Sequence, residues 1–327
     1  MTKIGVISNP KSQYNRQAGL APIEEVVADH AQLTHEPLFD FATLDEIIER
    51  FIRDDVEVIA VNGGDGTVQA VLTALARRED GECPPKLAIL QGGMTNVIAK
   101  DVGMGGHPAK ALAQLSRRII DDNEGQETSI EHVSRPLIGL VTNGRKPTVY
   151  GMFFGAAGFH QAVLLAQENV RPKGLAGNLA SASSLVLILA RLLVGRPGAD
   201  NPLYRGEAMA IGLDGRRMMP ESPYLLLIAT TLDRLMLGLM PFWGETDKSI
   251  RYTSVAFPPE RLALALLPVL RGKPRPWMLE RGYRSGTVCN MAIDIKSPVV
   301  LDGEIYHPEP DCPIRLTGDR EATFLRC

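Results

Sequence analysis

Residues 56–78 read VEVIAVNGGDGTVQAVLTALARR and carry the strongest structural signal in the chain. The run Val56–Val61 is apolar and rich in β-branched residues, which is typical of a buried strand. It ends in Asn62-Gly63-Gly64, and a helical segment is predicted over 68–78. The stretch therefore predicts a strand, a tight glycine turn and a helix, which together make the centre of a βαβ unit.

The segments around this stretch repeat the same alternation. Strands are predicted at 4–8, 33–39, 56–61 and 87–90, and helices at 21–30, 43–52, 68–78, 95–101 and 109–120. Strands that alternate with helices imply a parallel sheet with helices on both faces. We therefore expect an α/β fold that begins with a doubly wound parallel-sheet nucleotide domain over residues 1–132.

The pattern changes from about residue 130, where short β-rich segments are separated by Gly, Asn, Asp and Pro. Such segments occur at 136–141, 148–154, 207–213, 224–230, 251–255, 287–295 and 298–301. They predict an antiparallel, β-sandwich-like domain over residues 133–312. Helical insertions are expected at about 159–195 and 259–271, and the tail 313–327 is expected to pack back on the first domain.

The overall composition is that of a globular protein, with 45% hydrophobic and 22% charged residues among 327. This length favours two domains. The net charge of −3 arises from 35 basic and 38 acidic side chains, so there is no global basic field to attract nucleic acid. A nucleic-acid partner is therefore not expected.

Cysteine usage and hydropathy indicate a cytoplasmic protein. The four cysteines are scattered without metal-ligand spacing, which favours a reducing compartment and no zinc site. The first residues read as a strand rather than a signal peptide. Residues 179–194 form an apolar stretch that includes Arg191. A spanning helix needs about 20 apolar residues, so this stretch is too short to predict a membrane span.

The loop Gly63-Gly64-Asp65-Gly66 has the chemistry of a phosphate site. Its glycines allow the backbone to approach phosphate oxygens, and the helix that follows directs N–H groups and a positive dipole end at the same place. Asp65 repels phosphate, so it needs a metal ion or a hydroxyl proton as partner, and both occur in phosphoryl transfer. The alternative is a tight turn with a solvated aspartate. Neither the Gly-Lys-Ser/Thr of a P-loop nor a dinucleotide fingerprint is present.

The segment VNGGDGTVQAVLTAL resembles the GGDGT motif of the diacylglycerol kinase catalytic-domain superfamily, which includes bacterial lipid kinases and sphingosine and ceramide kinases. NAD kinases and phosphofructokinases share a related motif. Further segments resemble the lipid kinases in the same order along the chain. They are ISNPKS at 7–12, GMTNVIA at 93–99, FGAAGF at 154–159 and LDGE at 301–304.

The chain departs from the family pattern at three places. Met94 stands where the family usually has a nucleotide-contacting Thr, and Thr95 could supply that hydroxyl. Val97 replaces a common Asp. The DDG loop that holds a structural metal in some bacterial members has no clear counterpart, since the nearest segment is 242–247, FWGETD.

The resemblance implies roles for three carboxylates. Asp302 would be the general base that accepts the proton of a lipid hydroxyl. Glu304 would assist Mg²⁺ or orient Asp302, and it points to the same side as Asp302 if the segment is extended. Asp65 would serve Mg-ATP directly or through water. A simple Asp302-Gly303 hairpin turn is the alternative, and the division of roles between base and metal ligand stays open.

The resemblance also implies a nucleotide site for ATP and Mg²⁺, lined by small and polar residues. These are Asn9, Gly63, Gly64, Asp65, Gly66, Thr67, Gly93, Thr95 and Asn96. Asn9 is equally consistent with a turn former.

The acceptor would be a diacylglycerol-like or sphingoid lipid. Apolar helices in 159–195 and 259–271 could wall an acyl-chain cavity, rest on a bilayer or be ordinary core. A basic loop around Trp277 suits an anionic membrane surface at the inner face, although most such loops are merely solvated. Two alternatives to a lipid kinase stay open, namely an NAD kinase-like enzyme and a catalytically weak lipid- or nucleotide-binding regulator.

Overall fold

The strand and helix predicted on either side of the glycine turn are both present: β3 spans Val56–Gly63 and α4 spans Asp65–Ala76. The computed structural model describes residues 2–78, 84–93, 96–123, 130–142, 146–170, 204–235 and 238–326. The chain forms two units, Met1–Arg135 with Glu321–Cys327, and Pro136–Arg320. It leaves the first unit within β5 (Glu131–Val141) and returns within β15 (Ile314–Arg326).

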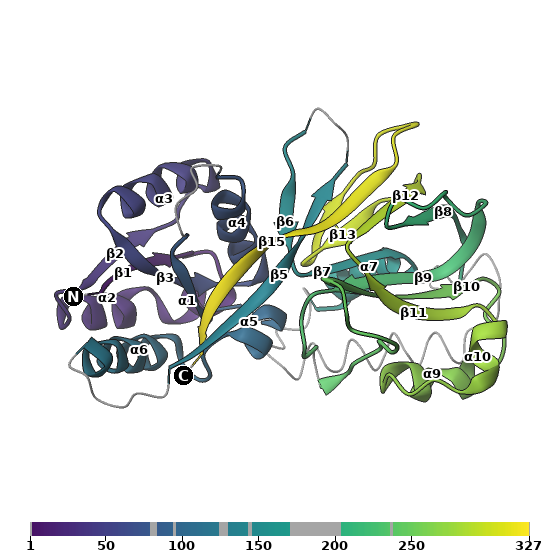
Figure 1. Cartoon of the computed structure of the whole chain (residues 1–327). Helices are drawn as coiled ribbons and strands as arrows, with labels where there is room; N and C mark the ends of the chain where they lie inside the picture. Colours follow the sequence, from purple (N-terminus) through teal and green to yellow (C-terminus); the bar gives the residue numbers. More distant parts are fainter. Residues whose placement is uncertain are drawn as a thin grey trace. The chain divides into compact units, whose positions relative to one another are not determined.

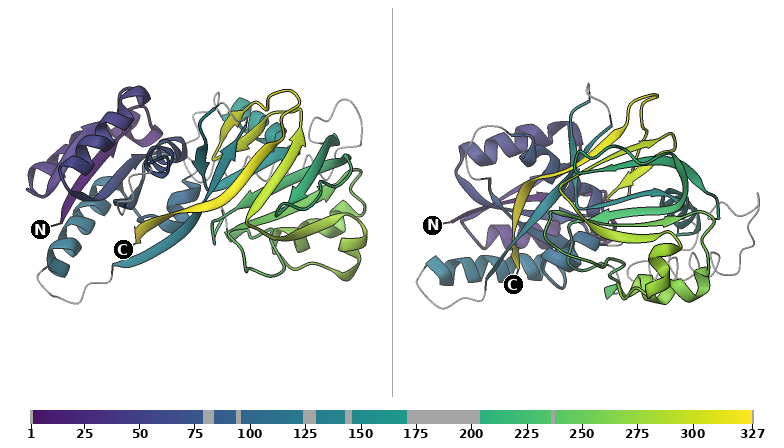
Figure 2. Two further views of the ribbon diagram at one scale, coloured as in Figure 1. Left: turned by 45° about the horizontal axis from the view of Figure 1, so that its top comes forward. Right: turned by 45° about the vertical axis from the view of Figure 1, so that its right-hand side comes forward.

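The first unit is built on a parallel sheet. Its strands are β1 (Lys3–Ser8), β2 (Leu33–Pro37), β3 and β4 (Lys86–Gln91), in the spatial order β2-β1-β3-β4. The end of β15 continues this sheet, because Phe324 pairs in parallel with Leu87 of β4. Figure 2 shows the long strands β5 (teal) and β15 (yellow) side by side, as their pairing requires.

Helices cover both faces of this sheet (Figure 1). The longer ones besides α4 are α2 (Ala21–Ala28), α3 (Leu44–Arg53) and α6 (Pro108–Asn123), and the shorter ones are α1 (Gln13–Ala18), α5 (Val97–Val102) and a 3-10 turn at Phe41–Thr43. Ile4 and Val6 pack with α2 and α6, whereas Phe51 of α3 packs on the opposite face against Gly5. Adjacent residues of a strand point to opposite faces of the sheet. Because helices cover both faces, the residues that point to either face must be apolar. The predicted doubly wound parallel-sheet domain is thus confirmed.

The second unit is rich in antiparallel strands. They are β6 (Val149–Gly151), β7 (Phe153–Ala157), β8 (Glu207–Leu213), β9 (Ser222–Thr230), β10 (Ile250–Ala256), β11 (Tyr283–Val288), β12 (Asn290–Ile295), β13 (Val299–Leu301) and β14 (Glu304–Tyr306). The order β14-β13-β7-β9-β8-β12-β15 encloses an apolar core that includes Phe154, Leu227 and Ile293. The described helices here are α7 (Gly158–Val170), α9 (Leu262–Leu270) and α10 (Pro276–Glu280).

Two strands that the sequence predicts as continuous are each broken in the middle. The segment 148–154 divides at Met152 into β6 and β7, and 287–295 divides at Cys289 into β11 and β12. At each break, two consecutive backbone N–H groups donate to a distant aspartate, Asp302 in the first case and Asp214 in the second. An amide that donates to a carboxylate is withdrawn from the sheet ladder, which breaks the strand.

Residues 179–194, the apolar stretch considered for a membrane span, lie outside the described residues. Among the described helices, none is both long and apolar enough to cross a bilayer.

Phe324 tests how firmly the chain end is built into the first unit. Its side chain is fully buried, with 0% exposed. Phe324→Ala should lower the free energy of unfolding by about 3–5 kcal/mol, because it removes a buried ring and leaves a cavity. Phe41, with 48% of its surface exposed, supplies the matched control, and Phe41→Ala should cost about 0.5 kcal/mol or less. Urea unfolding measures both, and equal small effects would mean that the chain end contributes nothing to this core.

Candidate functional site

The strands of the first unit bring three loops to one edge of the sheet. Ser8 pairs with Asn62, and Gly63 pairs with Gln91, so β1, β3 and β4 end level with one another. The chain leaves β1 for β2 on one side, while β3 lies on the other side of β1. A parallel sheet opens a crevice at such a reversal, outside the carboxyl ends of its strands, and ligands bind there. The glycine turn after β3 lies at this edge.

The loops after β3 and β4 touch through their glycines. A Cβ on Gly93 would lie 2.6 Å from the Cα of Gly64, and a Cβ on Gly92 would lie 2.9 Å from the backbone N of Gly63. Side chains cannot be accommodated at these distances, so backbone packs directly on backbone. The contact leaves a surface of main chain beside the N-terminus of α4, which suits the close approach of phosphate oxygens.

Asp65 lies between the N-termini of two helices. It is the first residue of α4, and its carboxylate accepts hydrogen bonds from the backbone N–H groups of Val97 (3.2 Å) and Ile98 (3.3 Å) at the start of α5. A negative charge is stabilised at both helix N-termini. Asp65 therefore has a structural partner of its own, beside any role toward a metal ion.

Asn96 shapes the loop that precedes α5. Its backbone is left-handed, with φ of 49°. Its Oδ1 accepts from the Gly93 N–H (2.8 Å), and its Nδ2 donates to the Gly93 carbonyl (2.9 Å). These two bonds join Gly93 to Asn96. Met94 and Thr95 stand between them in the sequence. Both residues lie outside the described part of the chain, so the role of Thr95 stays a prediction.

Asn9 and Thr67 are bonded to each other. The Asn9 Nδ2 donates to the Thr67 Oγ1 (2.8 Å), and the Asn9 Oδ1 accepts from the Lys11 N–H (2.8 Å). Both side chains are buried, with 9% and 3% exposed. The structure thus shows Asn9 as a turn former that also ties the loop after β1 to the first turn of α4.

A buried polar network beneath these loops was not found from the sequence. The Asn62 Nδ2 donates to the Ser8 Oγ (3.1 Å) and to the Asn15 Oδ1 (3.2 Å), and Asn15 in turn donates to the Asn9 carbonyl (2.8 Å). A fully buried asparagine must be hydrogen-bonded, so the network fixes the ends of β1 and β3. The signal that could have revealed it was the polar Asn62 at the end of an otherwise apolar strand.

Lys100 is a second residue that sequence reasoning missed. It lies on α5, and burial lowers the pKa of its ammonium group while the nearby Asp65 carboxylate opposes that shift. The cation therefore stands close to the GGDGT loop, one turn along the helix that Asp65 caps.

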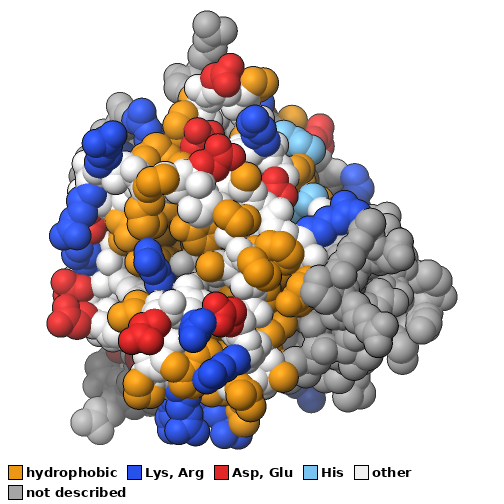
Figure 3. Space-filling view, turned by 90° about the vertical axis from the view of Figure 1, so that its right-hand side faces the viewer, with side chains coloured by type: hydrophobic (Ala, Val, Ile, Leu, Met, Phe, Trp, Pro, Cys, Tyr) orange, Lys and Arg blue, Asp and Glu red, His pale blue; other side chains and the backbone are white. Residues whose placement is uncertain are grey.

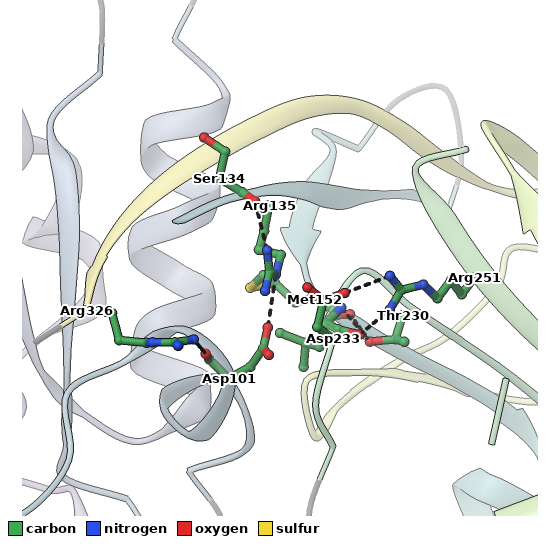
Figure 4. A network of polar contacts seen from close by, with 9 residues as sticks. Asp101, Ser134, Arg135, Met152, Thr230, Asp233, Arg251 and Arg326 are labelled. Carbon is green, nitrogen blue, oxygen red and sulfur yellow. Dashed lines mark hydrogen bonds and ion pairs between the residues drawn. The ribbon is translucent and has the colours of Figure 1, made fainter. Parts of the chain in front are cut away.

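The far end of α5 is anchored to the two strands through which the chain leaves and re-enters the first unit. Asp101 is buried, with 1% exposed, and accepts from the Arg135 Nε on β5 (3.1 Å). Arg326 on β15 donates to the Asp101 carbonyl (3.3 Å) and pairs with Glu131 (3.0 Å). Figure 4 shows both arginines directed at Asp101. The helix capped by Asp65 is therefore held at both ends.

In the second unit, Asp302 and Gly303 form the tip of a two-residue hairpin between β13 and β14. Their φ angles are 50° and 92°, and Leu301 pairs with Glu304 across the turn. Positive φ at both central residues is the geometry that favours Asp-Gly in such hairpins. The Asp302 carboxylate accepts from the N–H groups of Met152 (3.0 Å) and Phe153 (2.8 Å), and the Asp302 N–H donates to the Phe153 carbonyl (2.8 Å).

The hairpin corrects one expectation about Glu304. The alignment of Glu304 with Asp302 assumed an extended segment, and that assumption is wrong, because the chain reverses between them. Glu304 is exposed on β14.

Asp214 is a structural twin of Asp302. It begins an Asp-Gly hairpin after β8, in the sequence LDGR, with φ angles of 50° and 72°. Its Oδ1 accepts from the N–H groups of Cys289 (2.8 Å) and Asn290 (3.0 Å), and its own N–H donates to the Asn290 carbonyl (2.9 Å). The repeated LDG triplet was the signal in the sequence, and the shared geometry shows that this turn alone does not identify a catalytic aspartate.

Asp214 also forms an ion pair within the second unit. The Asp214 Oδ2 accepts from the Lys248 Nζ at 2.6 Å. Burial acts to raise the pKa of the Asp214 carboxyl, but hydrogen bonds from Lys248 and from the two amides lower it below its ordinary value. Asp214 is thus held as an ion-paired structural carboxylate.

The break that Asp302 makes at Met152 has its own polar support. The Met152 carbonyl accepts from the Thr230 Oγ1 (2.8 Å) and the Thr231 N–H (3.1 Å). Arg251 then donates to the Leu232 carbonyl (3.1 Å) and to Asp233 (2.7 Å), as Figure 4 shows for the Asp233 pair. A chain of hydrogen bonds therefore positions the amides that hold Asp302.

The described residues contain no group of three or more His, Cys, Asp or Glu side chains placed to hold a metal ion. In the segment nearest to the family's metal loop, Asp247 accepts from the Thr287 hydroxyl at 2.6 Å. An Mg²⁺ that also uses phosphate oxygens and water needs just one or two protein carboxylates.

Comparison with known proteins agrees with this geometry. The family described as "Diacylglycerol kinase catalytic domain" matches residues 3–124, which include the GGDGT loop and Asn96. No curated protein matches the sequence.

Solved structures with the same fold come from Bacillus anthracis str. Sterne. One, of a diacylglycerol kinase, is 17% identical with a TM-score of 0.58, and the match covers 98% of this chain and 96% of that one. Another, of a protein proposed to be a diacylglycerol kinase, is 18% identical with a TM-score of 0.63 over the same shares. These TM-scores show that the chain shares its fold with those proteins. Residues 3–124 in addition match the diacylglycerol kinase catalytic-domain family.

Proposed function

We propose that this chain is an ATP-dependent lipid kinase that transfers the γ-phosphate of ATP to a hydroxyl of a diacylglycerol-like or sphingoid lipid. Nucleotide binding is assigned to residues 1–132, and acceptor binding to residues 133–312. The proposal places the enzyme in lipid metabolism, as in phospholipid biosynthesis, in the cytoplasm or at the inner face of the membrane.

The observation that carries the proposal is the contact between the loops after β3 and β4. A Cβ at Gly93 would strike Gly64, so the two loops present main chain where phosphate would lie. The residues therefore suit a nucleoside triphosphate, held by the backbone of Gly63, Gly64, Gly66 and Gly93 and by loops that Asn9, Thr67 and Asn96 shape. Thr95 is proposed to contribute its hydroxyl. Mg²⁺ bound with the nucleotide would neutralise phosphate charge, and Asp65 and Glu304 are the carboxylates proposed to serve it.

Asp302 is proposed as the general base. Its carboxylate is fixed by two amide donors, Met152 and Phe153, and charge-assisted hydrogen bonds of this kind hold a group in one orientation. A base so fixed takes the proton from the acceptor hydroxyl while that oxygen attacks phosphorus. Such help is worth roughly 10²–10⁴ in rate.

The acceptor is identified by transfer of label from γ-labelled ATP, with Mg²⁺, to a panel of compounds. The panel comprises diacylglycerol, monoacylglycerol, phosphatidylglycerol, ceramide, a sphingoid base and NAD. We expect label in one of the lipids. Label in NAD alone would replace the lipid assignment with a soluble-acceptor kinase, and nucleotide binding without any transfer would indicate a regulator.

Asp302→Asn should lower kcat by roughly 10²–10⁴-fold, while nucleotide affinity changes little. Asp214→Asn is the matched control, because Asp214 occupies the same kind of turn and accepts the same pair of amide bonds. Asp214→Asn should have a lower free energy of unfolding than wild type but a kcat within a few fold of the wild-type value. Equal losses of kcat in the two variants would show that Asp302 acts only as a structural carboxylate.

The stability contributed by Asp214 should depend on pH. Its folded-state pKa lies below the ordinary value of 3.8, so its ionised form stabilises the fold above that pH and this contribution is lost as the pH falls through the folded pKa. The difference in unfolding free energy between wild type and Asp214→Asn should therefore be constant near neutrality and shrink in acid. Thermal unfolding at several pH values measures it, and a difference that grows in acid would contradict the assignment.

Gly93→Ala tests the glycine contact. The added Cβ would meet the Gly64 backbone, and relieving such an overlap costs about 1–3 kcal/mol. We expect the affinity for ATP, measured with a fluorescent analogue, to fall roughly 5–150-fold. This ratio of dissociation constants corresponds to about 1–3 kcal/mol of binding free energy. Gly105→Ala is the control, since a Cβ there would have no neighbour within 4 Å. If Gly93→Ala is folded and binds ATP as tightly as wild type, the contact between the two loops is not needed for nucleotide binding.

A further inference from the structure

Helix α9 exposes apolar side chains that its neighbours do not cover. Its sequence, LALALLPVL, is apolar throughout, yet just Ala265 and Val269 are buried. Leu264 and Leu267 are 68% and 53% exposed, and they lie three residues apart on one side of the helix. On the next helix, α10, Leu279 is 67% exposed. Single exposed leucines are common, but a helix with an apolar outer side is a candidate interaction surface.

The inner sides of both helices are firmly packed. Ala265, Val269 and Met278 share a core with Tyr283 of β11, and Trp277 packs against that core. The Trp277 ring lies edge-on to Tyr283 at 5.9 Å, with the Arg261 guanidinium 5.7 Å from its centroid. The exposed leucines therefore project from an ordered platform.

Basic side chains flank these leucines in the sequence. Residues 260–281 contain five Lys and Arg against two Glu, a local charge of +3, although the whole chain carries −3. One of the two acids, Glu260, is paired with Arg281. Figure 3 shows basic and apolar side chains together at the lower edge of the side of the molecule that it presents. The exposed cations are Arg261, Arg271, Lys273, Arg275 and Arg281.

We propose that this α9–α10 face, made of the three exposed leucines and the five cations, docks on a lipid bilayer that contains anionic headgroups. Leucines that enter the acyl boundary gain from burial, while lysine and arginine stay at the headgroup level and attract anionic lipid. A second copy of the chain is a poorer occupant, because a two-fold pairing would bring like cations together. The inference deepens the proposed function and rests on it, since a lipid kinase must reach an acceptor that resides in a bilayer.

Vesicle flotation tests docking without turnover. Wild-type protein should float with phosphatidylglycerol/phosphatidylcholine vesicles and not with phosphatidylcholine alone, and added salt should weaken the binding. Arg271→Gln/Lys273→Gln should lower partitioning about 25-fold, at about fivefold for each charge removed. Leu264→Ser/Leu267→Ser/Leu279→Ser should lower it roughly tenfold or more.

Matched variants elsewhere separate the face from general surface properties. Arg216→Gln/Arg217→Gln removes two exposed cations of the same unit, and Phe39→Ser removes a side chain that is 67% exposed. Both should float as wild type does. Thermal unfolding confirms that each variant is folded.

Three outcomes would overturn the proposal: flotation that the α9–α10 variants do not reduce, flotation that ignores lipid charge, or a changed oligomeric state in the leucine variant with vesicle binding intact. Phosphorylation of lipid in detergent micelles reports the kinase activity separately. Activity in micelles without flotation would reject the docking face but would agree with the proposed kinase activity. Flotation that depends on the face, without activity on any lipid, would support docking and reject the kinase.

Discussion

An aspartate carboxylate that accepts two consecutive backbone N–H groups recurs at three decisive points of this protein. Asp65 holds the start of α5, Asp302 holds the break between β6 and β7, and Asp214 holds the break between β11 and β12. Each bond joins segments far apart in the sequence. Because amide-to-carboxylate bonds are directional and charge-assisted, they fix where helices begin and where strands stop.

This arrangement explains why Asp302, the proposed base, and Asp214, an ion-paired structural carboxylate, have the same local geometry. Asp302 and Asp214 share the LDG triplet, the left-handed turn and the pair of amide donors, but Asp214 is also neutralised by Lys248. The carboxylate geometry supplies orientation, and the surroundings decide what that orientation is used for. The catalytic role proposed for Asp302 therefore rests on the resemblance of residues 301–304 to the DGE signature of lipid kinases and on the proposed function, rather than on the turn.

The loops after β1, β3 and β4 show a similar division between framework and surface. Buried side chains of Ser8, Asn9, Asn15, Asn62 and Thr67 bond to one another and hold the strand ends. The glycines then form the surface, where backbone contacts backbone. Asn9, Thr67 and Asn96, which the resemblance implies as nucleotide contacts, have hydrogen bonds of their own within the protein.

The sequence by itself determined the fold class, because alternating apolar runs and glycine turns leave few ways to bury a parallel sheet. It also determined where the glycine turn lies, since the GGDGT stretch follows a buried strand directly. Only the tertiary structure decided that the 148–154 and 287–295 segments are broken, that residues 302–304 reverse direction, and which groups surround Asp65. Those features depend on hydrogen bonds between residues 32 to 150 positions apart, and local propensity contains no information about partners at that separation.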